Sequence, residues 1–258
     1  MTGNIKIARS WRELNDWQLQ EIADIYINCQ PEEFAQAYEK MILILFQKEA
    51  TYSGRSFLYK LTAEIPISEL EFDARFLIDT TDHHTFPVIP GLIKPADRLG
   101  DITAKHFSTI DTYFFNWNRD RSLINLKRLV ATLYRLEEKF DDLHLIPVSK
   151  ITDKIPKKQM SVIALAYLFS RIVLEDSFPL VFPVKKEEQD EDKLEPKFKK
   201  KEADFIPFDK AIIGMAMAEN KPLGKKQDVN NVRIYEFLSV MSESIIINQQ
   251  KEKINAGK

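Results

Sequence analysis

Two adjacent histidines, His83 and His84, lie close in sequence to Asp79 and Asp82, and this cluster carries the donor atoms that a metal ion needs. Side chains of adjacent residues point apart, so the two histidines are poorly placed to ligate one ion together. Cys29 is the only cysteine, which excludes a disulfide within the chain and a zinc site built on several cysteines. We therefore predict no metal site, and a solvated loop around the histidines.

Carboxylate pairs could in principle serve general acid–base chemistry, but adjacent acids are common on helix surfaces. The pairs are Glu32/Glu33, Glu137/Glu138 and Asp141/Asp142. The sequence contains no Gly-x-Ser-x-Gly elbow and no glycine-rich phosphate loop. We predict no catalytic residue and no cofactor, and we expect a protein that is not an enzyme. The alternative is an enzyme whose site is assembled by residues far apart in the sequence.

Large aromatic and apolar residues could anchor a partner protein, because such side chains dominate binding energy at interfaces. Burial in the core of the chain is the competing interpretation for each of them. The partner-binding candidates are Trp11, Trp17, Trp117, Ile234, Tyr235 and Leu238.

Basic residues gather on one side of a predicted helix and suggest a second hypothesis, an accessory protein of a mobile element that binds nucleic acid. They are Arg121, Lys127, Arg128 and Arg135. The formal net charge of the chain is −2, which gives no general attraction for phosphate. Nucleic acid is therefore not the partner that we expect.

The elements that would position these residues are mainly α-helices. Apolar residues recur every three to four positions, and there are 17 Phe but only 7 Gly among the 258 residues. Asn15 and Thr103 are suited to cap helices, and Pro31 is suited to a first helical position. The remaining helices are predicted at 68–78, 121–138, 157–175, 208–219 and 232–250.

The region between Thr51 and Pro95 has a different pattern. Residues 55–61 are compatible with a short strand, and residues 86–93 with an extended segment broken by Pro90 and Gly91. We expect at most one small β-hairpin here in an otherwise helical fold.

The charged segment 185–206 divides the predicted domains. Residues 185–202 contain almost no apolar side chains, so burial cannot offset the entropy lost on ordering them. We predict a helical main domain over 1–184, a flexible charged linker over 185–206 and a two-helix C-terminal module over 207–258.

Membrane insertion is not expected. The first residues lack an apolar signal core, and the most apolar run, Met160 to Leu174, is too short to span a bilayer. A reducing compartment is the expected location.

Several segments resemble an uncharacterised protein family found among the virion and tail genes of phages and prophages of the Bacteroidetes. The segments are Trp11-x-x-Leu14-x-x-Trp17-Gln18-Leu19, Leu126 to Arg135, and Phe178-Pro179-Leu180-Val181-Phe182. The region from Phe208 to Ala218 and then from Asp228 to Leu238 is similar to the last helices of small phage tail-assembly proteins. The charged segment 185–206 is a departure from that pattern.

The resemblance implies a phage structural or assembly protein, either a tail or neck component or a tail-assembly chaperone. It implies other phage structural proteins as partners, with self-association as a further possibility, and it carries over no catalytic residue. The expected location is the host cytoplasm during assembly, with incorporation into the virion as the alternative.

Overall fold

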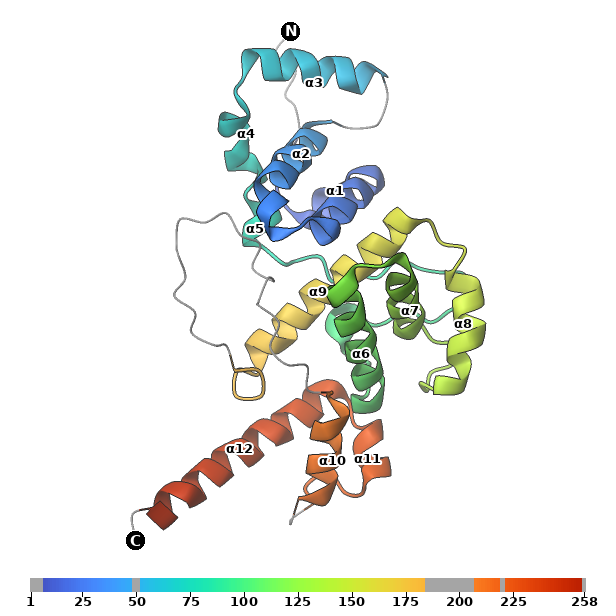
Figure 1. Cartoon of the computed structure of the whole chain (residues 1–258), viewed down its shortest axis with the longest axis vertical. Coiled ribbons are helices and arrows are strands. Elements are labelled where there is room, and N and C mark those ends of the chain that lie inside the picture. Colours follow the sequence, from blue (N-terminus) through green and yellow to red (C-terminus); the bar gives the residue numbers. More distant parts are fainter. Residues whose placement is uncertain (1–6, 48–51, 184–206, 219–220, 257–258) are drawn as a thin grey trace. The chain divides into compact units, whose positions relative to one another are not determined.

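The computed structural model describes residues 7–47, 52–183, 207–218 and 221–256 (Figure 1). Every regular element among these residues is a helix, which confirms the prediction of a mainly α fold. Within this part of the chain no strand forms, and β-type pairing is limited to two isolated bridges, Ile93 with Arg135 and Thr103 with Arg233.

The described residues fall into two compact units. The first comprises 7–47, 52–84 and 155–169, and the second comprises 85–154, 170–183, 207–218 and 221–256. The boundaries predicted at 184 and 207 do not coincide with this division, because the C-terminal helices belong to the same unit as residues 85–154. The predicted linker, 185–206, lies outside the described residues.

The first unit is built around the aromatic side chain of Trp11. Its ring makes edge contacts with the rings of Tyr26, Phe76 and Phe169, at centroid distances of 5.5, 6.2 and 5.2 Å. Its helices are η1 (Trp11–Glu13), α1 (Asp16–Asn28), η2 (Pro31–Glu33), α2 (Phe34–Phe46), α3 (Tyr52–Glu64), α4 (Ile67–Ala74), α5 (Phe76–Asp79) and the first turns of α9 (Lys157–Ser177).

Local signals explain where α1 begins and how it meets α2. The Asn15 side chain accepts a hydrogen bond from the Gln18 backbone, and the Gln18 side chain accepts one from the Asn15 backbone, forming a capping box. The buried Gln18 amide also donates to the carbonyl oxygen of Leu45 at 2.8 Å. Gln18 therefore starts one helix and satisfies a free carbonyl at the end of the next.

Two expectations for this unit are wrong. The predicted strand at 55–61 is part of α3, and Leu58, Leu61 and Thr62 are half-buried among those side chains of α3 that the structure describes, a helical spacing. His83 and His84 are buried rather than solvated.

Helix α9 carries the most apolar run of the chain, and its side chains from Met160 to Ser170 are buried. This confirms the prediction of a buried helix at 157–175. Among the described residues, none of the helices combines the length and the apolar character that crossing a membrane requires.

The second unit is organised around helix α6, which packs against α7 and the three C-terminal helices. The Phe107 ring lies 4.9 Å from that of Phe208, which in turn lies 5.3 Å from that of Phe237. Its helices are η3 (Asp97–Leu99), α6 (Ala104–Asp120), α7 (Leu123–Leu133), η4 (Asp142–His144), α8 (Leu145–Thr152), α10 (Asp209–Met217), α11 (Lys226–Asn231), α12 (Ile234–Ala256) and the last turns of α9.

Backbone hydrogen bonds tie the start of α12 to the start of α6. The Ala104 amide donates to the Val232 carbonyl, and the Ile234 amide donates to the Ile102 carbonyl, both at 2.8 Å. Residues after 207 are thereby attached to the segment that precedes α6, as one packed unit.

Candidate partner-binding groove

A groove of about 390 Å³ opens between α7 and α8 in the second unit, with Tyr113 of α6 contributing to its lining. Its residues supply both apolar contact area and charge. They are Tyr113, Ile124, Lys127, Arg128, Ala131, Thr132, Leu145, Ile146, Ser149 and Asp153.

The wall formed by α7 is set by the tight connection from α6. Arg121 ends α6 in the left-handed conformation, with φ of 52°, and its guanidinium lies 4.3 Å from the centre of the Trp117 ring. Ser122 then caps α7 by accepting a hydrogen bond from the Asn125 amide. This turn orients α7 so that its Leu126, Leu129 and Leu133 side chains are buried.

The wall formed by α8 is fixed at three points. Asp141 caps the turn η4 by accepting a hydrogen bond from the Leu143 amide at 2.9 Å, and Lys105 of α6 forms an ion pair with Asp142 at 2.6 Å. Val148 is buried on the inner side of α8. These contacts attach the inner side of α8 to the rest of the unit, and Ile146 lies on the outer side.

A neutral histidine supports the base of the groove. The Nε2 atom of His106 lies 2.6 Å from the carbonyl oxygen of Thr132 and donates to it, and its ring stacks on Phe140 at 4.0 Å. Burial lowers the pKa of His106 to about 4, so the imidazole is uncharged at neutral pH. His106 thus joins the end of α7 to the segment that leads into α8.

The end of α7 is also held by Arg135, which is only 5% exposed and pairs with Asp101. The backbone of Arg135 exchanges hydrogen bonds with Ile93. The helix predicted over 121–138 therefore stops at Leu133, because tertiary contacts draw Arg135 out of the helical path.

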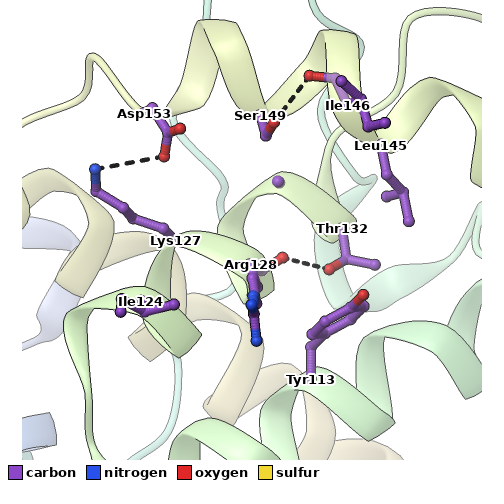
Figure 2. Close-up of a pocket in the computed structure, with 10 residues that line it drawn as sticks. Tyr113, Ile124, Lys127, Arg128, Thr132, Leu145, Ile146, Ser149 and Asp153 are labelled. Atoms are coloured by element: carbon purple, nitrogen blue, oxygen red, sulfur yellow. Dashed lines mark hydrogen bonds and ion pairs between the residues drawn. The ribbon is translucent and has the colours of Figure 1, made fainter.

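Figure 2 shows the α7 and α8 side chains on opposite sides of the opening. Lys127 and Asp153 form an ion pair of 3.5 Å across one end of the groove, and Ile146 and Leu145 line the other end. Ile124 on α7 is 64% exposed and Ile146 on α8 is 69% exposed. Each wall therefore carries a large apolar side chain that is mostly in water.

Arg128 is the charged group of the groove that no acid neutralises among the described residues. Its guanidinium makes one long hydrogen bond of 3.4 Å to the Asn125 side chain. The charged residues of the lining are Lys127, Arg128 and Asp153, and their formal charges sum to +1. The formal net charge of the whole chain is −2. The groove is a locally positive, partly apolar site on an acidic protein.

The six residues predicted to bind a partner lie elsewhere, in both units. Trp11, Trp117, Ile234 and Leu238 are buried, so in this structure they pack the interior of their units and present no surface. Trp17 and Tyr235 are half-buried, and the Tyr235 hydroxyl donates to the Arg98 carbonyl at 2.8 Å. The same periodicity that makes a residue a candidate anchor also buries it on the packed side of its helix.

One feature of the sequence of α7 indicates the groove, although the apolar stripe of leucines on this helix is more prominent. Ile124, Arg128 and Ala131 follow one another at spacings of four and three, on the side of α7 opposite its buried leucines. An isoleucine on the side of a helix opposite its main apolar stripe indicates an apolar residue outside the core that the stripe forms, and Ile124 is 64% exposed. The opposing wall, α8, was not predicted.

The basic residues of the nucleic-acid hypothesis are dispersed in the structure. Arg135 is buried with Asp101, Lys127 pairs with Asp153, and Arg121 lies over the Trp117 ring. Arg128 presents a charge that no acid neutralises among the described residues. A track of several free cations, which nucleic acid requires, is not formed by these four residues.

Among the described residues, no group of three or more His, Cys, Asp or Glu side chains is arranged to hold a metal ion. Comparisons of the chain with models of protein families, with curated proteins and with solved structures give no match.

Proposed function

We propose that this protein is a non-enzymatic structural or assembly protein of a phage, acting as a tail or neck component or as a tail-assembly chaperone through contacts with other phage proteins. The observation that carries the contact role is the groove between α7 and α8, whose opposite walls expose Ile124 and Ile146. Covering one such side chain is worth about 1.5–3 kcal/mol, so a partner that covers both gains a substantial part of its affinity.

The phage role is supported by the resemblance of three segments to a family of virion and tail genes. One of these segments, residues 126–135, includes most of α7, and it supplies Lys127, Arg128, Ala131 and Thr132 to the groove. The residues that carry the resemblance therefore include one wall of the proposed contact site. The location that follows from this proposal is the host cytoplasm during assembly.

The test is an affinity purification of the tagged full-length chain from cells that also express the genes flanking its own. Mass spectrometry is expected to identify a tail, neck or capsid component. The variant Ile124→Ser/Ile146→Ser should lose that component, whereas Leu143→Ser should retain it, since Leu143 is 80% exposed but does not line the groove.

Two results would count against the proposal. One is the recovery of no phage component by the unaltered chain, together with its absence from purified virions. The other is recovery of such a component at equal levels by all three proteins, which would remove the groove from the contact while leaving the phage role in place.

A further inference from the structure

We propose that the groove between α7 and α8 binds an acidic amphipathic helix of a partner protein, with a carboxylate on Arg128 and apolar side chains on Ile124 and Ile146. This inference rests on the proposed function, because it specifies the partner of the same site. Charge complementarity is its basis: the lining carries +1 on a chain of net charge −2.

The geometry of Arg128 favours a carboxylate. The planar guanidinium can hold both oxygens of one carboxylate through parallel hydrogen bonds, and its single long bond to Asn125 leaves most of its donors available. The Tyr113 side chain lines the same groove, and its hydroxyl is a further hydrogen-bond donor (Figure 2). Arginine and tyrosine together offer donors for one anion of this size.

A single carboxylate fits the charge of the groove better than a phosphate group does. Lys127 is already neutralised by Asp153, so one free cation remains for the ligand. A phosphate carries close to two negative charges at neutral pH and would need a second cation. The partner is thus a protein segment with an acidic residue set between apolar ones.

A helix suits the groove because it satisfies its own backbone hydrogen bonds. Strand addition would need an open sheet edge, and no strand forms among the described residues. The two exposed isoleucines lie on opposite walls, so apolar residues at helical spacings of three and four can contact both. A volume of about 390 Å³ accommodates a few such side chains.

The experiment is a selection of mRNA-displayed, alanine-rich helical peptides, randomised along one side, on the immobilised full-length chain. Enriched peptides are expected to carry Asp or Glu between two apolar residues at helical spacing. Enrichment of peptides without an acidic residue, or no enrichment above that on Arg128→Gln, would overturn the proposal.

Affinities of the best peptide and its Glu→Gln form are then measured by fluorescence anisotropy. On the unaltered chain the acidic form should bind about tenfold or more tightly, since a charge-assisted hydrogen bond is lost in the other. Arg128→Gln should abolish this difference. Lys150→Gln should preserve it, because Lys150 is an exposed cation on α8 outside the lining.

The apolar part of the contact has its own matched pair of variants. Ile146→Ser should weaken both peptides, and Leu143→Ser should weaken neither. Circular dichroism of each variant shows whether it is folded, so that a loss of binding is not a loss of structure. If the two peptides bind equally well while the co-purification of a phage component succeeds, the partner chemistry is wrong and the proposed function stands.

Discussion

Both units of this protein bury large aromatic side chains, and they differ in the polar side chains that they keep out of water. In the first unit the largest buried side chains are aromatic, and Trp11 contacts three other rings. Among the described residues, the first unit also buries His83 and His84, whereas the second unit buries His106, Asp111 and Arg135 on and around α6. Arg135 pairs with Asp101, and Asp111 pairs with Arg171, whose guanidinium also lies 5.1 Å from the centre of the Phe114 ring.

The two units hold their helices together through different sets of contacts. In the first unit, ring contacts around Trp11 bring α1, α5 and α9 together, and the Ser161 hydroxyl of α9 also donates a hydrogen bond to Asp24 of α1 at 2.7 Å. Hydrogen bonds and ion pairs fix distances and directions, and in the second unit they set the segments that carry α7 and α8. The groove lies in the unit that contains the largely buried ion pairs of Arg135 with Asp101 and of Asp111 with Arg171.

The largest effect is expected from Trp11→Ala in the first unit. The ring is 1% exposed, and its loss removes three aromatic contacts and leaves a cavity. The free energy of unfolding should fall by about 3–5 kcal/mol. Denaturant unfolding followed by circular dichroism measures this, with Trp17→Ala as the half-buried control. An equal, small loss for both variants would show that the aromatic cluster is not what holds this unit.

His106 should make the stability of the second unit depend on pH. Its pKa is about 4 in the folded protein, against about 6.5 in an unfolded chain. The unfolded state therefore takes up the proton first, and the free energy of unfolding should fall by about 3 kcal/mol between pH 6.5 and pH 4. His106→Gln should remove this part of the pH dependence.

Denaturant unfolding should be measured between pH 6.5 and pH 4 for the unaltered chain and for His106→Gln. The quantity to compare is the change in the free energy of unfolding over this pH range. Asp101 and Asp142 raise the pKa of His106 slightly and Arg135 lowers it, but these groups are present in both proteins. A variant with the same pH profile as the unaltered chain would mean that the imidazole is not buried as the structure has it.

Asp101→Asn should have an intermediate effect. The change keeps the size of the side chain but leaves the buried Arg135 without its anionic partner. A loss of about 2 kcal/mol is expected, below the value for a fully buried pair because Asp101 is partly in water. Asp153→Asn, which breaks the exposed pair with Lys127, should cost about 0.5 kcal/mol or less. Thermal unfolding in parallel distinguishes the two, and equal losses would argue against the buried pair.

The smallest effect on stability is expected from Ile146→Ser, because this side chain is 69% exposed. The free energy of unfolding should change by about 0.5 kcal/mol or less. Binding of the acidic helical peptide should nevertheless weaken markedly. A large loss of stability would instead place Ile146 in the packing of α8, and would remove it from the contact surface.

Local sequence signals predicted much of the helical structure correctly. Thr103 caps α6 by accepting a hydrogen bond from the His106 amide, and Asn15 caps α1. Helix α9 occupies the apolar run between Lys157 and Ser177. Such features depend on residues within one or two turns, so they are visible in the sequence alone.

The end of α7 and the position of α8 were not visible in this way. The pattern of α7 continues to Glu138, but the helix stops at Leu133 because Ile93 and Asp101, distant in sequence, bind the backbone and side chain of Arg135. Helix α8 contains Pro147 near its start and was not predicted, although Pro is compatible with a first turn.

The sequence by itself determined the helical class, several helix starts and the presence of one long buried helix. The tertiary structure decided which apolar residues are covered: Trp11, Trp117, Ile234 and Leu238 are inside, whereas Ile124 and Ile146 are outside. The physical reason is that the two properties depend on interactions over different separations in the sequence. Helix formation depends on neighbours along the chain, but the exposure of a side chain depends on which distant segment packs against it, and spacing alone does not specify that segment.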